Sequence, residues 1–221
     1  MKSVALISGG IDSFVASAFE KSNGSTIFGL TVDYKQLHRR EINSAEKVGK
    51  FLNVKEHKFI NIDLSWLPSS LTNRDYVEKK HKSGIPSTYV PSRNTILISI
   101  ALAYAEAIDA ESIVVGVHSI DYSGYPDCRP EYIKAFQKLI DAGTRKTIEG
   151  GRIELRAPLI LMRKSEIIKL GISLGLDFSI TWSCYKGGSK ACGICDSCKI
   201  RLEAFRQAGI VDQIEYEKTF A

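Results

Sequence analysis

Short apolar segments alternate with segments of helical periodicity at the start of the chain. The apolar segments predict buried parallel strands over 3–7 and 25–32, and a third strand is expected near 56–62. Apolar residues recur at helical spacing after the first segment, and a second helix is expected over 38–52. This order of strands and helices opens a doubly wound sheet. We therefore predict an α/β fold with a mostly parallel, Rossmann-like sheet.

The periodic pattern is interrupted over 63–93 and then resumes. Prolines, glycine and polar residues fill this connection, which is typical of a lid or a binding loop. The elements expected beyond it are an apolar helix over 95–108 with Asn94 as N-cap, a strand over 112–117, a helix over 130–144 that begins with Pro130, a strand over 153–155, a helix to about Leu174 capped at or before Ser165, and a last helix from about Ser197.

Composition adds few constraints to this picture. The chain has 221 residues, of which 44% are hydrophobic, so one domain with a packed core is expected over 1–221. The net charge of +5 permits nucleic-acid binding without requiring it. The basic residues are dispersed except for Arg39-Arg40 and a run over 79–82, which is either a solvated segment or one that closes over phosphates. No apolar run reaches membrane-spanning length and the first strand begins at Ser3, so a cytoplasmic protein is expected.

A glycine- and serine-rich loop separates the first strand from the first helix. It consists of Ser8, Gly9, Gly10, Ile11, Asp12 and Ser13. Free backbone N–H groups and the helix dipole hold anions at such a turn, and glycine lets the backbone approach a bulky ligand. Asp12 repels a phosphate, so it fits either as a ligand of a bridging Mg²⁺ or as a helix cap. The motif is neither a Walker A loop nor a dinucleotide fingerprint, and an ordinary tight turn is the alternative.

Further polar residues follow other predicted strands. Arg93 and Lys164 lie at predicted helix starts, where each either faces the same anion or is an ordinary surface cation. The loop after the fourth strand holds four candidates for binding a flat heterocycle, namely Asp121, Tyr122, Asp127 and Arg129. Tyrosine stacks on a ring, aspartate accepts from ring N–H groups or holds Mg²⁺, and arginine binds a carboxylate. A turn with Asp caps is the alternative.

Four cysteines lie close together in the C-terminal segment. Cys184, Cys192, Cys195 and Cys198 have the spacing C-x7-C-x2-C-x2-C, with glycines between them. Four thiolates at this spacing favour a closed, structural zinc site that holds the segment 180–221. An iron–sulfur cluster is the main alternative, whereas disulfides are not expected in the cytosol.

Taken together, these motifs resemble one family. S-G-G-x-D-S resembles the pyrophosphate loop of the N-type ATP pyrophosphatases. Within that superfamily, the segments 87–94 (S-T-Y-V-P-S-R-N) and 121–129 (D-Y-S-G-Y-P-D-C-R) and the four cysteines resemble the 7-cyano-7-deazaguanine synthases, over nearly the whole chain.

The resemblance implies an ATP-dependent ligase. ATP adenylates a carboxylate on a 7-deazaguanine, ammonia displaces AMP, and a second activation dehydrates the amide to a nitrile used in queuosine or archaeosine synthesis. The loop 8–13 would hold the ATP pyrophosphate with Mg²⁺, and the cysteines would bind Zn²⁺. We expect Asp12, Ser13, Arg93 and Lys164 to be catalytic. The expected partners are small molecules, with no direct contact to nucleic acid or membrane, and a homodimer is the candidate assembly. No glutaminase domain is expected, so the donor is free ammonia or ammonia from a partner.

Two other functions stay open at this point. In a tRNA thiolation enzyme of the same superfamily, Cys128 would carry a persulfide and the cluster would instead hold iron and sulfur. A zinc-stabilised nucleic-acid-binding module would have no ATP turnover and would show strongly salt-dependent binding.

Overall fold

The centre of the fold is a parallel sheet. The structure, a computed structural model, describes residues 1–73, 85–118 and 124–217. Within these residues the sheet has five parallel strands in the order β3-β2-β1-β4-β5. They are β1 (Lys2–Leu6), β2 (Thr26–Asp33), β3 (Glu56–Asn61), β4 (Ser112–Val114) and β5 (Glu154–Arg156). The strand order reverses between β1 and β4, which confirms the predicted doubly wound sheet.

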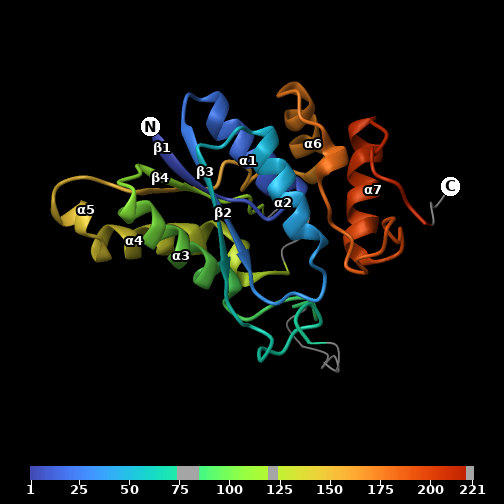
Figure 1. Cartoon of the computed structure of the whole chain (residues 1–221), viewed down its shortest axis with the longest axis horizontal. Helices are drawn as coiled ribbons and strands as arrows, with labels where there is room; N and C mark the ends of the chain where they lie inside the picture. The colour runs from blue at the N-terminus through green and yellow to red at the C-terminus, as the bar shows by residue number, and fades with distance from the viewer. Residues whose placement is uncertain (74–84, 119–123, 218–221) are drawn as a thin grey trace.

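Helices cover both faces of the sheet (Figure 1). One face is covered by α1 (Ile11–Ser22), α2 (Arg40–Phe51), α6 (Lys164–Ser173) and α7 (Asp196–Ala208). The other is covered by α3 (Arg93–Ala107) and α4 (Pro130–Gly143), and α4 leads into the short α5 (Arg145–Ile148). Two 3₁₀ turns, η1 (Pro126–Cys128) and η2 (Phe178–Ile180), precede α4 and the cysteine segment. Among the described helices, none combines the length and the hydropathy needed to cross a membrane.

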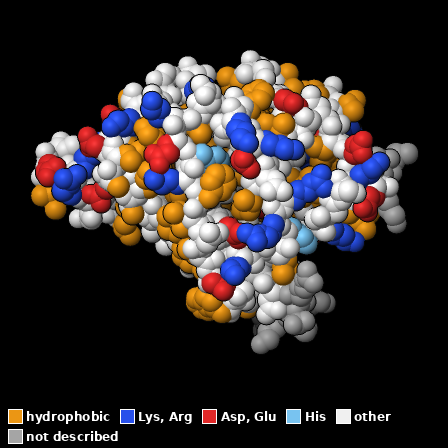
Figure 2. Space-filling model, in the orientation of Figure 1, with side chains coloured by type: hydrophobic (Ala, Val, Ile, Leu, Met, Phe, Trp, Pro, Cys, Tyr) orange, Lys and Arg blue, Asp and Glu red, His pale blue; other side chains and the backbone are white. Residues whose placement is uncertain are grey.

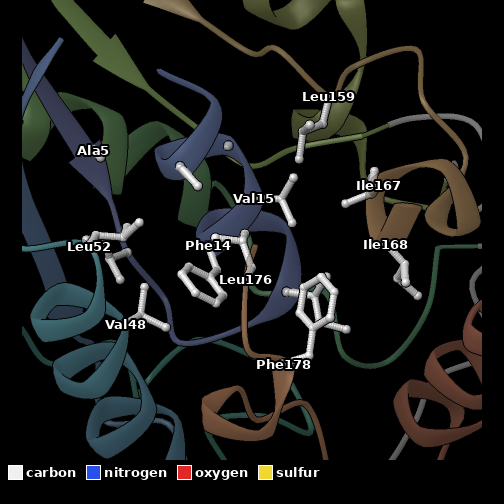
Figure 3. Close-up of a cluster of buried hydrophobic side chains, with 14 of the residues drawn as sticks. Ala5, Phe14, Val15, Val48, Leu52, Leu159, Ile167, Ile168, Leu176 and Phe178 are labelled. Carbon is white, nitrogen blue, oxygen red and sulfur yellow. The ribbon is translucent and has the colours of Figure 1, made fainter. Parts of the chain in front are cut away.

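Successive side chains along the strands point to opposite faces of the sheet, so the protein has a hydrophobic core on each face. Ala5 of β1 belongs to the core under α1, α2 and α6, whereas its neighbour Val4 belongs to the core under α3 and α4. Figure 3 shows the first core, in which Phe14 of α1 faces Phe178, with ring centroids 6.4 Å apart and planes nearly perpendicular. Strands β1 and β2 are buried on both faces, so most of their side chains are apolar, which is why the sequence showed apolar segments there.

A buried ion pair ties α7 to the C-terminal segment. Arg201 is 1% exposed and binds both carboxylate oxygens of Asp212, at 2.7 and 2.9 Å. It also donates to Thr181 Oγ1 at 2.9 Å and to the carbonyl of Phe178 at 3.2 Å. These bonds compensate for the desolvation of the guanidinium, so α7 is held against the turn that leads to the cysteines.

Two local predictions are wrong at element ends. Asn94 lies inside α3, whose N-cap is Ser92. The backbone N–H of Asn94 donates to the Asp127 carboxylate at 3.0 Å, so a residue distant in sequence takes the role of a local cap. Strand β4 ends at Val114 instead of 117. Helix α6 is capped by Arg163, in agreement with the predicted cap at or before Ser165. Lysines and arginines are interspersed with acidic residues on the face shown in Figure 2. The basic run over 79–82 lies outside the described residues.

Candidate active site

A cavity of about 340 Å³ opens at the carboxyl edge of the sheet. It lies where the strand order reverses, between β1 and β4, and this is the place where doubly wound sheets bind ligands. Its wall contains many of the residues singled out in the sequence: Ser8, Gly10, Ile11, Asp12, Ser13, Arg93, Cys128 and Lys164.

The loop between β1 and α1 is held in shape by its own hydroxyl groups. Ser13 Oγ accepts from the Ser8 backbone at 3.1 Å and lies 3.0 Å from Ser8 Oγ, and it also donates to the Gly10 carbonyl. Gly9 has a φ of +86°, and a Cβ there would lie 2.2 Å from the carbonyl oxygen of Glu41. Glycine is therefore required both by conformation and by the close approach of α2.

Helix α1 begins without a side-chain cap. Its N-cap is Gly10, so the predicted alternative in which Asp12 caps the helix is wrong. Asp12 lies instead in the first turn, and its carboxylate is directed to another element. The first N–H groups of α1 consequently border the cavity at the positive end of the helix dipole, which favours an anion.

Lys164 of α6 reaches Asp12 across the cavity wall. Its Nζ lies 2.5 Å from both carboxylate oxygens, and His118 Nε2 lies 3.7 Å from one of them. Lys164 is the first residue of α6, where the Arg163 N–H donates to the Glu166 carboxylate at 2.7 Å and fixes the start of the helix. A cation is thus fixed beside the loop 8–13.

Arg93 lies at the start of α3, on the other side of the cavity. Its Nη1 donates to the Tyr34 hydroxyl at 3.2 Å, and its guanidinium lies 5.6 Å from the centre of the Tyr34 ring. The structure therefore brings Arg93, Lys164 and the loop 8–13 to one cavity. Two cations and a helix N-terminus around one space suit a ligand with several negative charges.

The four residues predicted to bind a heterocycle are placed differently. Asp127 is buried and accepts from the backbone of Asn94, and Arg129 Nε donates to the Pro126 carbonyl at 3.2 Å. Neither belongs to the wall of the cavity. Asp121 and Tyr122 lie outside the described residues. A role in substrate binding stays a prediction for all four.

Cys128 does line the cavity, and its thiol is protonated at neutral pH. Burial raises the pKa of this thiol to about 11, and the neighbouring Asp127 carboxylate adds to the shift. The Asn94 side-chain amide lies 3.4 Å from Cys128 Sγ. A protonated thiol is a weak nucleophile.

The four cysteines of the C-terminal segment form one cluster. Their Sγ atoms all lie within 4.8 Å of one another, and those of Cys192 and Cys198 are 4.0 Å apart. Thiolates about 2.3 Å from a tetrahedral Zn²⁺ would be roughly 3.8 Å apart, so the cluster has about the right size. Backbone N–H groups of Lys186 and Cys192 point at Cys184 Sγ, both at 3.3 Å, which stabilises a thiolate. The residues therefore fit a four-thiolate metal site.

Trp182 connects this cluster to the loop beside α1. Its backbone N–H donates to the Gly9 carbonyl at 3.0 Å, and its indole N–H donates to the Cys184 carbonyl at 3.0 Å. The guanidinium of Arg40 lies 3.9 Å from the centre of the indole ring and also donates to the Gly188 carbonyl. The cysteine cluster and the loop 8–13 are therefore parts of one hydrogen-bonded unit.

Comparison with known proteins identifies the family. The model of the family described as "Queuosine biosynthesis protein QueC" matches residues 2–209. The chain belongs to this family. A QueC relative from Trichodesmium erythraeum, named 7-cyano-7-deazaguanine synthase, is 49% identical over 97% of this chain and 100% of its own length. One of the same name from Coxiella burnetii is 49% identical over 97% of each chain.

The fold also has a structural neighbour outside the QueC family. The solved structure of a 4-thiouridine synthetase–RNA complex with bound ATP has a TM-score of 0.50 and 17% identity, covering 94% of this chain and 50% of that chain. At this identity the likeness concerns the fold alone.

Three residues of this QueC-family site could not be found by motif. A Cβ on Gly116, after β4, would lie 2.5 Å from the Ser13 backbone nitrogen, so glycine lets β4 approach the loop. His118 follows two residues later and approaches Asp12. Glu41 lines the cavity from the first turn of α2. An isolated glycine after a strand was the only sequence signal among these.

Proposed function

We propose that this chain converts 7-carboxy-7-deazaguanine and ammonia to 7-cyano-7-deazaguanine at the expense of ATP. The two QueC relatives described above are named for this activity, and their matches to this chain cover 97–100% of their own lengths. The observation that carries the proposal is the cavity in which the S-G-G-I-D-S loop meets both Lys164 and Arg93. One domain over 1–221 would perform the whole reaction, and ATP as a substrate favours a cytoplasmic location.

In this proposal the loop 8–13 binds the β- and γ-phosphates of ATP, which leave as pyrophosphate. The first N–H groups of α1 and the hydroxyls of Ser8 and Ser13 bind the β- and γ-phosphates, so the α-phosphate faces the cavity. A carboxylate oxygen of the substrate attacks the α-phosphorus, and pyrophosphate departs with the electron pair of the broken P–O bond. Lys164 and Arg93 stabilise the charge that develops around the α-phosphate.

The nitrogen enters in the next step. Ammonia attacks the carbonyl carbon of the acyl adenylate, the C–O bond to AMP breaks, and the amide forms. The amide oxygen then attacks the α-phosphorus of a second ATP. Pyrophosphate departs again, and loss of both amide N–H protons with cleavage of the C–O bond gives the nitrile and a second AMP. The protein contributes orientation and charge stabilisation in every step, without a covalent intermediate on a side chain.

Two metal ions belong to the proposal. Asp12 supplies carboxylate oxygens of the kind that Mg²⁺ prefers, beside the loop proposed to hold phosphates. Bound Mg²⁺ would offset the charge of the phosphates. Cys184, Cys192, Cys195 and Cys198 would hold a structural Zn²⁺, since all four positions of a tetrahedral site are filled by protein.

The test is incubation with 7-carboxy-7-deazaguanine, ATP, Mg²⁺ and ammonium. Mass spectrometry of the deazaguanine product and nucleotide analysis are read together. We expect the nitrile together with AMP and pyrophosphate, and the loss of all three in Asp12→Ala. Release of ADP, or transfer of sulfur to tRNA with ATP in place of nitrile formation, would refute the proposal.

A further inference from the structure

A carboxylate without a role in the steps above lies in the wall of the same cavity. Glu41 belongs to the first turn of α2, and its carbonyl oxygen is the atom that a Cβ on Gly9 would meet at 2.2 Å. The residue is therefore fixed next to the loop proposed to bind ATP.

The proposed chemistry requires a proton acceptor in this cavity. When NH3 attacks the acyl adenylate, its nitrogen becomes positively charged in the tetrahedral adduct. An N–H proton must leave on the way to the neutral amide, and a base that removes it in the adduct prevents the ammonia from being expelled again. A positioned group whose pKa is close to the working pH does this best.

Within the described residues, Asp12 and Glu41 are the carboxylates in the cavity wall. Asp12 is held by Lys164 at 2.5 Å through both of its oxygens and is approached by His118. No hydrogen bond or ion pair within 4.0 Å engages the Glu41 carboxylate in the part of the chain that the structure describes. Glu41 is therefore the carboxylate that can exchange a proton without breaking an ion pair.

The surroundings of Glu41 bring its titration to neutral pH. Burial raises the pKa of this carboxyl to about 7, and the opposing attraction of Arg93, at the start of α3, limits the rise. Tyr34, which follows β2, is the other titratable group that interacts with it electrostatically. The loop packed against α2 contributes Asp12, whose charge is paired with Lys164.

We propose that Glu41 is the general base of the aminolysis step. Its carboxylate removes one N–H proton from the nitrogen of the tetrahedral adduct. The C–O bond to AMP then breaks, AMP leaves with the electron pair, and the amide and a protonated Glu41 remain. This inference rests on the proposed function, because the adduct forms only if the substrate has been adenylated.

The experiment separates adenylation from aminolysis. Exchange of labelled pyrophosphate into ATP, measured with the carboxylate substrate but without ammonium, reports adenylation, which needs no base. Amide formation after ammonium addition, followed by rapid quench, reports aminolysis. For Glu41→Gln we expect exchange within a few-fold of wild type and aminolysis slower by about 100-fold or more.

Glu46→Gln is the matched control. Glu46 is an exposed residue of the same helix and pairs with Lys50 at 2.6 Å, so both rates should stay at the wild-type level. Aminolysis within a few-fold of wild type in Glu41→Gln would overturn the inference. An equal loss of exchange and aminolysis would also overturn it, because Glu41 would then act in ATP binding. If wild type shows no exchange at all, the proposed function itself fails.

The pH dependence provides a measurement that needs no variant. Glu41 is neutral below its pKa, so the wild-type aminolysis rate per free NH3 should fall about tenfold for each pH unit below 7. In Glu41→Gln, the residual aminolysis rate per free NH3 should not depend on pH. A wild-type rate per free NH3 that is independent of pH between 5.5 and 7.5 would overturn the inference.

Discussion

Lys164 and Asp12 lie 152 positions apart in the sequence, and Lys164 Nζ lies 2.5 Å from both carboxylate oxygens of Asp12. The contact joins the first turn of α6 to the first turn of α1, so a late helix of the Rossmann-like fold contributes to the cavity that begins at its first loop. Both side chains are largely buried, which strengthens the attraction relative to a surface pair.

Replacement of Lys164 should therefore impair chemistry more than folding. In the proposed mechanism, Lys164→Met removes a cation beside the α-phosphate of ATP, and we expect kcat for nitrile synthesis to fall by about 100-fold or more. Steady-state kinetics with AMP release provides the measurement. Lys169→Met is the control, since Lys169 is exposed on the same helix and should retain wild-type rates. If Lys164→Met retained the wild-type kcat, Lys164 would have no catalytic role.

Gly116 gives a second prediction, on the packing of β4 against the loop. A Cβ would lie 2.5 Å from the Ser13 nitrogen and 2.6 Å from the Asp12 carbonyl carbon, and both are backbone atoms. Gly116→Ala should destabilise the protein by roughly 1–3 kcal/mol in urea unfolding and weaken ATP binding. Gly143→Ala, where nothing lies within 4 Å, should leave stability unchanged or slightly increased. Equal stability of both variants would show that the loop can move aside without cost.

The sequence was informative where a property is local. Continuous apolar segments revealed the strands, and Gly9 and Gly10 marked an anion-binding turn. It was less informative where a contact with a residue distant in sequence determines the local structure. Asn94 looked like a cap, but Asp127 satisfies the start of α3 instead. The importance of Glu41 depends on the approach of α2 to the loop, which no spacing in the sequence reveals.

The cysteine cluster should support ATP binding as well as stability. Cys195→Ser removes one of four thiolates, so we expect loss of bound metal, measured by elemental analysis, and a lower Tm. Since Trp182 connects the Cys184 carbonyl to the Gly9 carbonyl, KM for ATP should rise as metal is lost. A variant with full metal content and unchanged Tm would contradict a four-cysteine site.

Cys128 distinguishes the proposed function from tRNA thiolation. Burial holds its pKa near 11, which disfavours a thiolate nucleophile, and the proposed mechanism uses no thiol. Cys128→Ser should keep most nitrile synthesis and its full metal content. Complete loss of product with normal substrate binding would indicate a covalent thiol intermediate and would favour the thiolation enzyme.

The most direct test of the central claim follows the oxygen atoms of the substrate. If the substrate carboxylate attacks the α-phosphate of ATP, and the amide oxygen does so again, each carboxylate oxygen ends on an AMP. With both oxygens labelled with ¹⁸O, the account predicts two AMP molecules for each nitrile, each with one label in its phosphoryl group. Label in ADP, in inorganic phosphate or in water, with unlabelled AMP, would contradict it.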